Sequence, residues 1–138
     1  MSSFKIFDIA GSGMSAQSVR LNTTASNLAN ADSVSGDPRT VYKARHPVFT
    51  VAQNAPGAPQ GEGSAVQVAG IVESNKEPVK RYDPGNPLAD AQGYVYSPGV
   101  NVVEEMVDMI SASRSYQNDV EVVKTARDLM LATLRLGQ

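Results

Sequence analysis

The sequence predicts a mainly α-helical protein with a small β insert, in which long N- and C-terminal helices pair as an antiparallel coiled coil. Three observations support this prediction. Apolar residues recur every seven positions near both ends of the chain. A segment between the ends alternates apolar and polar residues, as strands do. Segments rich in glycine, proline and serine separate these elements.

The N-terminal helix is predicted over Ser3 to Asn30. Gly11 and Gly13 each weaken such a helix by about 1 kcal/mol relative to alanine. We therefore expect it to be unstable alone, since isolated helices are marginal in water. Its predicted seam consists of apolar residues seven positions apart: Phe7, Met14, Leu21 and Leu28.

Residues 31–100 are predicted to form a β-rich insert. Thr40–Val51 and Ala65–Glu73 contain strand-like patterns and predict a hairpin, with Gly70 as a candidate bulge. The glycine- and proline-rich segment 53–64 between them is expected to be a flexible loop.

The second half of the insert is less regular. Ser74–Asp90 contains three prolines, at positions 78, 84 and 87, and no regular element is predicted there. Tyr94–Tyr96 is predicted to be a short strand. The turn Ser97-Pro98-Gly99 then leads into the second helix.

The C-terminal helix is predicted over Asn101 to Leu136, with no Pro or Gly inside it. Asn101 is the expected N-cap. A heptad held over about four repeats favours a coiled-coil seam over one face of a compact globule, because helices this long are unusual in small domains. The predicted seam residues are Val102, Met109, Tyr116, Val123 and Met130, with Met106, Val120 and Leu134 on the interleaved series.

Pairing of the two helices defines a domain of residues 1–30 and 101–138, with both termini at one pole. The helices are apolar around much of their circumference at that pole, at Phe4, Ile6, Phe7 and Ile9 and at Leu129, Met130, Leu131, Leu134 and Leu136. A helix that is apolar on every side must be buried on every side, and two helices cannot do this for each other. The missing cover is expected to come from other subunits, which indicates a polymerising structural protein.

The composition argues against several other functions. The net charge is −2 and no basic run suggests nucleic acid. No cysteine is present, so a disulfide, a thiol nucleophile and a Cys-based metal site are excluded. The apolar runs are too short for a membrane span, and the N-terminal residues lack the pattern of a secretory signal.

Candidate chemical sites are weak, so no enzyme activity, cofactor or metal is expected. His46 is the only histidine, and a lone histidine is a poor catalytic or metal-binding candidate. Glu104, Glu105 and Asp108 lie in the first turns of a helix, where the helix dipole already favours negative charge. Gly11-Ser12-Gly13 follows no strand and lacks the rest of a phosphate-binding loop.

Several motifs, in order along nearly the whole chain, carry a family resemblance. The most distinctive is the sequence Asn27-Leu28-Ala29-Asn30. The others are Ser12–Gln17, Tyr42–Phe49, Tyr82–Pro87, Gly93–Val95, Asn101–Met106, Ser113–Gln117 and Leu136–Gln138. Together they resemble the bacterial flagellar rod and hook family.

The resemblance implies a structural subunit of the proximal rod, in the periplasmic part of the flagellar basal body. It implies that the terminal helices form an inner tube and that the chain travels unfolded through the flagellar type III export apparatus, without a cleaved signal peptide. The implied partners are copies of the chain, other rod subunits and an adaptor protein at the rod base or export gate.

The Asn-Leu-Ala-Asn motif is predicted to end the first helix. Asn27 and Asn30 are expected to satisfy free carbonyls there or to adopt left-handed backbone conformations. Leu28 would complete the seam, and Ala29 would allow close approach of a neighbour. A fixed helix exit at a subunit contact and a simple cap both fit this motif.

Two other classes of protein remain as alternatives. A soluble helical adaptor or export chaperone would not need polymer contacts at both termini. An enzyme regulator or small hydrolase has no site constellation in this sequence.

Overall fold

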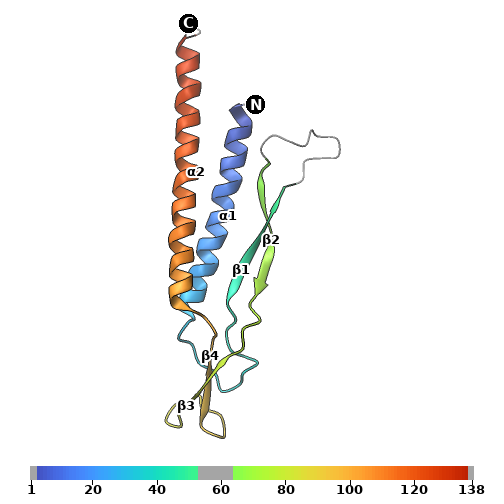
Figure 1. The fold of residues 1–138 in the computed structure, drawn as a ribbon, viewed down its shortest axis with the longest axis vertical. Helices are drawn as coiled ribbons and strands as arrows, with labels where there is room; N and C mark the ends of the chain where they lie inside the picture. The colour runs from blue at the N-terminus through green and yellow to red at the C-terminus, as the bar shows by residue number, and fades with distance from the viewer. Residues whose placement is uncertain (1–2, 53–63, 137–138) are drawn as a thin grey trace.

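The computed structural model describes residues 3–52 and 64–136 and forms an elongated molecule (Figure 1). Two long helices lie side by side and antiparallel, so α1 begins and α2 ends at the same end of the molecule. The elements in chain order are α1 (Ser3–Ala29), β1 (Arg45–Val51), β2 (Val66–Glu73), β3 (Val79–Tyr82), β4 (Tyr94–Ser97) and α2 (Val102–Leu136). The predicted class, mainly helical with a small β part, is confirmed.

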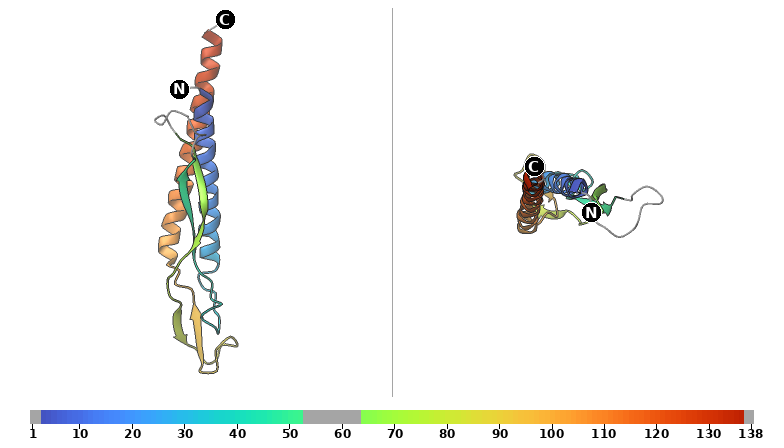
Figure 2. Two further views of the ribbon diagram at one scale, coloured as in Figure 1. Left: turned by 90° about the vertical axis from the view of Figure 1, so that its right-hand side faces the viewer. Right: turned by 90° about the horizontal axis from the view of Figure 1, so that it is seen from above.

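The β insert forms two separate antiparallel pairs, β1–β2 and β3–β4. The β1–β2 hairpin runs along α1, and β3–β4 lies beyond the end of the helices that is opposite the termini (Figures 1 and 2). The predicted hairpin is confirmed, and its register shifts between Val48 and Phe49, which face Gly70 and Val68. This shift leaves Ala69 unpaired, directly beside the glycine that suggested a bulge. Residues 53–63 of the predicted loop lie outside the described residues.

Strand β3 corrects the expectation that Ser74–Asp90 has no regular element. Pro78 and Pro84 lie just outside the strand, so neither removes a hydrogen bond from its ladder. Cross-strand aromatic contacts also stabilise it. The rings of Tyr82 and Tyr94 meet edge to face with centroids 5.2 Å apart, and Lys80 Nζ lies 3.8 Å from the Tyr94 ring centroid. β4 confirms the short strand predicted at Tyr94–Tyr96.

The ends of the helices follow the predicted chemistry in part. Asn101 caps α2, because its Oδ1 accepts hydrogen bonds from the backbone N–H groups of Val103 (3.0 Å) and Glu104 (3.4 Å). At the end of α1, Asn30 Nδ2 donates to the carbonyl of Ser26 at 2.8 Å, as expected for a cap. The expected left-handed conformation is wrong, since no described residue other than glycine has a positive φ.

The hydrophobic core is thin and made mostly of small side chains. Among the described residues, its buried apolar members are Ala10, Ala16, Val41, Ala44, Val95, Ala112 and Ala126. Small residues let the helix backbones approach closely, and Gly13 shows how closely. A Cβ atom at Gly13 would lie 2.7 Å from Asp119 Oδ2 on α2. At Gly11 a Cβ would meet nothing within 4 Å, so the two glycines have different roles.

Asn27 is the central polar residue of the fold and is completely buried. Its Nδ2 donates to the carbonyl of Arg45 on β1 (2.9 Å) and to Glu105 Oε2 on α2 (3.0 Å). Its Oδ1 accepts from the backbone N–H of Arg45 and from the Tyr42 hydroxyl, both at 2.8 Å. The side chain therefore makes all four hydrogen bonds of which an amide is capable and joins α1, β1 and α2.

We predict that Asn27→Ala lowers the free energy of unfolding by at least about 2 kcal/mol, because it leaves Glu105 and the Arg45 backbone without partners at a buried position. Asn30→Ala is the matched control and should cost about 1 kcal/mol or less, because it removes one hydrogen bond at a partly exposed helix end. Urea unfolding followed by circular dichroism measures both changes. Equal losses for the two variants would contradict the central role of Asn27.

Candidate assembly surface

The first turns of α2 carry an apolar stripe that faces away from the protomer. It consists of Val103, Met106, Val107 and Ile110, and each of these residues is at least 53% exposed. Their spacing of three, four and seven places them on one face of the helix. We call this group the α2 stripe. An exposed face of this kind on a helix is typical of an interaction surface.

The last two turns of α2 form a second apolar surface. α2 has 35 residues and α1 has 27, so α2 is roughly 12 Å longer at 1.5 Å per residue. It extends beyond the start of α1 (Figure 1). We call residues 130–136 the overhang. Within it Leu131, Leu134 and Leu136 are 45%, 68% and 89% exposed, so the protomer leaves these leucines largely uncovered.

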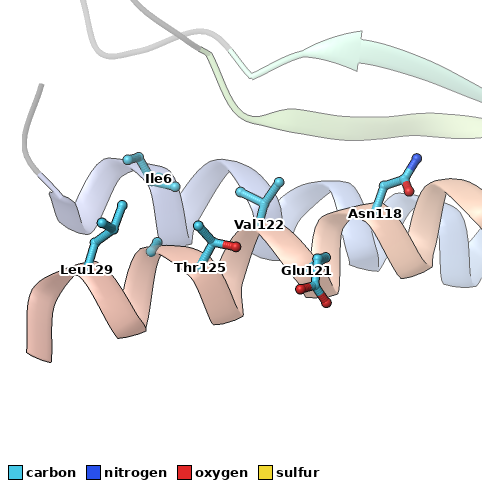
Figure 3. Close-up of a pocket in the computed structure, with 7 residues that line it drawn as sticks. Ile6, Asn118, Glu121, Val122, Thr125 and Leu129 are labelled. Carbon is cyan, nitrogen blue, oxygen red and sulfur yellow. The ribbon is translucent and has the colours of Figure 1, made fainter. Parts of the chain in front are cut away.

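A groove between the two helices lies next to the overhang (Figure 3). Its volume is about 470 Å³. Ile6 lines it from α1, and α2 contributes Asn118, Glu121, Val122, Thr125, Ala126 and Leu129. Ile6, Val122 and Leu129 supply apolar surface there, and Val122 and Leu129 are themselves exposed. The groove and the overhang together form one apolar region at the end where α1 begins.

The predicted seam residues differ in burial within the protomer. Val102 is 42% exposed and Leu134 is 68% exposed. The other eight are partly buried: Phe7, Met14, Leu21, Leu28, Met109, Tyr116, Val123 and Met130. In the motif, Asn27 is buried, Leu28 and Asn30 are partly buried, and Ala29 is exposed. Their role as a coiled-coil seam between the helices, or as contacts between subunits, stays a prediction.

The most buried face of α2 lies one residue before the interleaved series Met106, Val120 and Leu134. Glu105, Ala112 and Ala126 are its buried residues, and Asp119 occupies the same seven-residue series. The sequence did not predict this series as the buried face, because two of its members are acidic and two are small. Its regular spacing was the available signal, since small residues at heptad positions allow helices to pack closely.

Asp119 is a carboxylate in this close contact. Burial raises the pKa of Asp119 above its ordinary value of 3.8. The physical cause is the approach of α1 at Gly13, which takes water from the carboxylate. The charged form is therefore less favourable in the folded chain than in the unfolded chain.

The described helices include none with the length and apolar character needed to cross a membrane. Paired long helices, a thin alanine-rich core and large uncovered apolar surfaces define an elongated structural protein.

Comparisons with known proteins give the family. Residues 7–36 match the family described as "Flagella basal body rod protein", and residues 91–136 match "Flagellar basal body rod FlgEFG protein C-terminal". The chain is 56% identical to flagellar basal-body rod protein FlgC of Escherichia coli O6:H1 and 54% identical to that of Salmonella typhimurium, over the full length of both partners in each case. It is 38% identical to FlgC of Aquifex aeolicus over 96% of each chain. The chain therefore belongs to the FlgC family of flagellar rod proteins, and its function is that of a structural rod subunit.

We predict that Asp119→Asn stabilises the protein at pH 7, because it removes a desolvated charge. The folded pKa lies above the unfolded value, so the penalty is present at neutral pH and disappears as the pH falls through the raised pKa. The difference between variant and wild type in the urea midpoint should therefore shrink on acidification. A difference that is constant with pH would contradict this account of Asp119.

Proposed function

We propose that this chain is a subunit of the proximal rod, the part of the flagellar drive shaft that passes torque from the motor toward the hook. Its role there is mechanical rather than catalytic. The observation that carries the proposal is the apolar surface that the terminal helices leave uncovered, at the α2 stripe, the groove and the overhang. Neighbouring subunits would bury this surface and gain roughly 25 cal/mol for each Å² of apolar area removed from water.

The helices are proposed to form the inner tube of the rod. In it, residues 1–30 and 101–138 act as one coiled-coil domain, and residues 31–100 form a separate insert. The antiparallel pairing of α1 and α2 supports this arrangement, as does the seven-residue spacing of the buried face of α2. Copies of this chain and other rod subunits are the expected neighbours.

The route to the rod follows from the same proposal. The chain passes unfolded through the flagellar type III export apparatus, without a cleaved signal peptide, and joins the periplasmic rod through an adaptor at the rod base or export gate. A thin core supports this route, because a protomer that buries few large side chains needs less energy to unfold.

A soluble adaptor or export chaperone is the weaker alternative. Its relatives would be expected among chaperones, whereas the similar proteins are named rod proteins over their full length. A truncation separates the two functions. Loss of residues 129–138 should prevent incorporation of this chain into basal bodies, whereas an adaptor would instead change the export of another protein.

We predict that Leu28→Asp and Met130→Asp each block rod assembly without reducing synthesis, because each places a charge without a partner in a contact that the rod is proposed to bury. Swimming in soft agar and the rod content of purified basal bodies measure the effect. Asn22→Asp and Gln117→Asp are matched controls, since both add the same charge to exposed positions of the same helices. Normal swimming of the Leu28 and Met130 variants would contradict the packing scheme.

We further propose that the first turns of α1 become ordered only on assembly. Gly11 and Gly13 weaken these turns, and Ile6 lies beside an open groove. The Asn27 junction fixes only the opposite end of the helix.

Hydrogen exchange of the isolated protomer tests this idea. Amides of residues 3–12 should exchange faster than those of residues 20–29. Gly11→Ala should slow exchange in the first segment about fivefold, because alanine favours the helix by about 1 kcal/mol over glycine. The added Cβ meets no atom within 4 Å, so no clash offsets this gain. Gly13→Ala should gain less, because its Cβ meets Asp119. Slow exchange throughout α1, together with circular dichroism that shows two complete helices, would contradict the proposal that the first turns become ordered only on assembly.

A further inference from the structure

Three side chains with metal-binding groups meet beside the Asn27 junction. His46 comes from β1, and Glu105 and Asp108 come from the first turns of α2. One ligand atom from each lies within 4.8 Å of the others, and His46 Nε2 is 3.9 Å from Glu105 Oε1. Glu105 and Asp108 are three residues apart and so share a helix face. The single histidine of the chain therefore lies near two carboxylates that the sequence did not place beside it.

Glu105 is the most informative member of this cluster. The residue is only 5% exposed, and Asn27 Nδ2 donates to its Oε2 at 3.0 Å. Its Oε1 accepts no hydrogen bond from the described residues and lies on the His46 side of the carboxylate. This oxygen is therefore available to a cation, and the hydrogen bond from Asn27 fixes the orientation of the carboxylate.

The charge around the cluster also favours a cation. Arg20 Nη2 lies 2.7 Å from Asp108 Oδ1 and neutralises one of the two carboxylates. With His46 neutral, one negative charge remains. The second oxygen of Asp108 is still available, and ligating carboxylates are commonly held by a hydrogen bond of this kind.

The cluster is accessible from solvent. A cavity of about 340 Å³ opens beside it and is lined by Arg20, Thr24, His46, Pro47, Phe49 and Asp108. Several water molecules fit into this volume, since each occupies about 30 Å³ in the liquid. An ion can therefore enter and keep water as its remaining ligands.

We propose that His46, Glu105 and Asp108 bind Zn²⁺ or a divalent ion with the same ligand preference, such as Co²⁺. One imidazole nitrogen and two carboxylate oxygens suit Zn²⁺, whereas Mg²⁺ prefers oxygen ligands in an octahedron. Zinc bonds of about 2.0–2.1 Å place tetrahedral ligands roughly 3.3 Å apart, so the ligand atoms, which now lie within 4.8 Å of one another, would have to move closer by up to about 1.5 Å on binding. The ion would fasten β1 to α2 next to the hydrogen bonds of Asn27.

Isothermal titration of the full chain, freed of metal with EDTA, tests the proposal with ZnCl₂ and MgCl₂. We expect one saturable Zn²⁺ site per chain, and Mg²⁺ should not compete for it. His46→Gln should weaken Zn²⁺ binding by at least about tenfold, since changes even outside the ligand shell cost that much. Glu104→Gln is the matched control, because it removes a neighbouring exposed carboxylate outside the cluster and should leave affinity unchanged.

Cobalt supplies a second readout that does not depend on affinity. Co²⁺ bound at this site should give visible absorption bands that change in His46→Gln and persist in Glu104→Gln. Several weak Zn²⁺ sites, or binding and spectra that are the same in His46→Gln and wild type, would overturn the proposal. Circular dichroism of His46→Gln without metal shows whether the variant folds, and the partial exposure of His46 predicts that it does. None of these outcomes depends on whether the chain enters the rod.

Discussion

The buried amide of Asn27 is the interaction on which the rest of the fold depends. It lies where the end of α1, the start of β1 and the first turns of α2 meet, and each of its four hydrogen bonds is made inside the protein. Removal of such an amide leaves several buried partners without a hydrogen bond at once, which costs more stability than the loss of one contact. The two helices and the hairpin are therefore held in one arrangement at this end.

The other end of the helix pair is organised differently. Ala126 of α2 and Ile6 of α1 meet at a groove, and beyond it α2 continues without α1 beside it. Small residues dominate the interior of the protomer, whereas many of its leucines and valines face outward. A chain with this distribution has a firmly joined end and an end with much apolar surface still to bury, which suits a subunit that completes its packing in an assembly.

Periodicity was sufficient to predict both helices, their antiparallel order and the β1–β2 hairpin, because these depend on local patterns of apolar residues. It did not predict β3, which depends on aromatic partners across the strand pair. The observed buried face of α2 also lies one residue before the interleaved series that was predicted. Large apolar residues suggested Met106, but the close approach at Gly13 and the amide of Asn27 select Ala112, Ala126 and Glu105 for the interior. Asn27 looked like a helix cap because its partners are distant in sequence.

The central claim is that neighbouring subunits cover the apolar surfaces of α1 and α2. A reconstruction of the isolated basal body at side-chain resolution tests it most directly. The account predicts that the α2 stripe, the groove at Ile6 and the leucines of the overhang are all buried against other chains. Rod density in which these side chains face solvent, with contacts made only by the β insert, would contradict it.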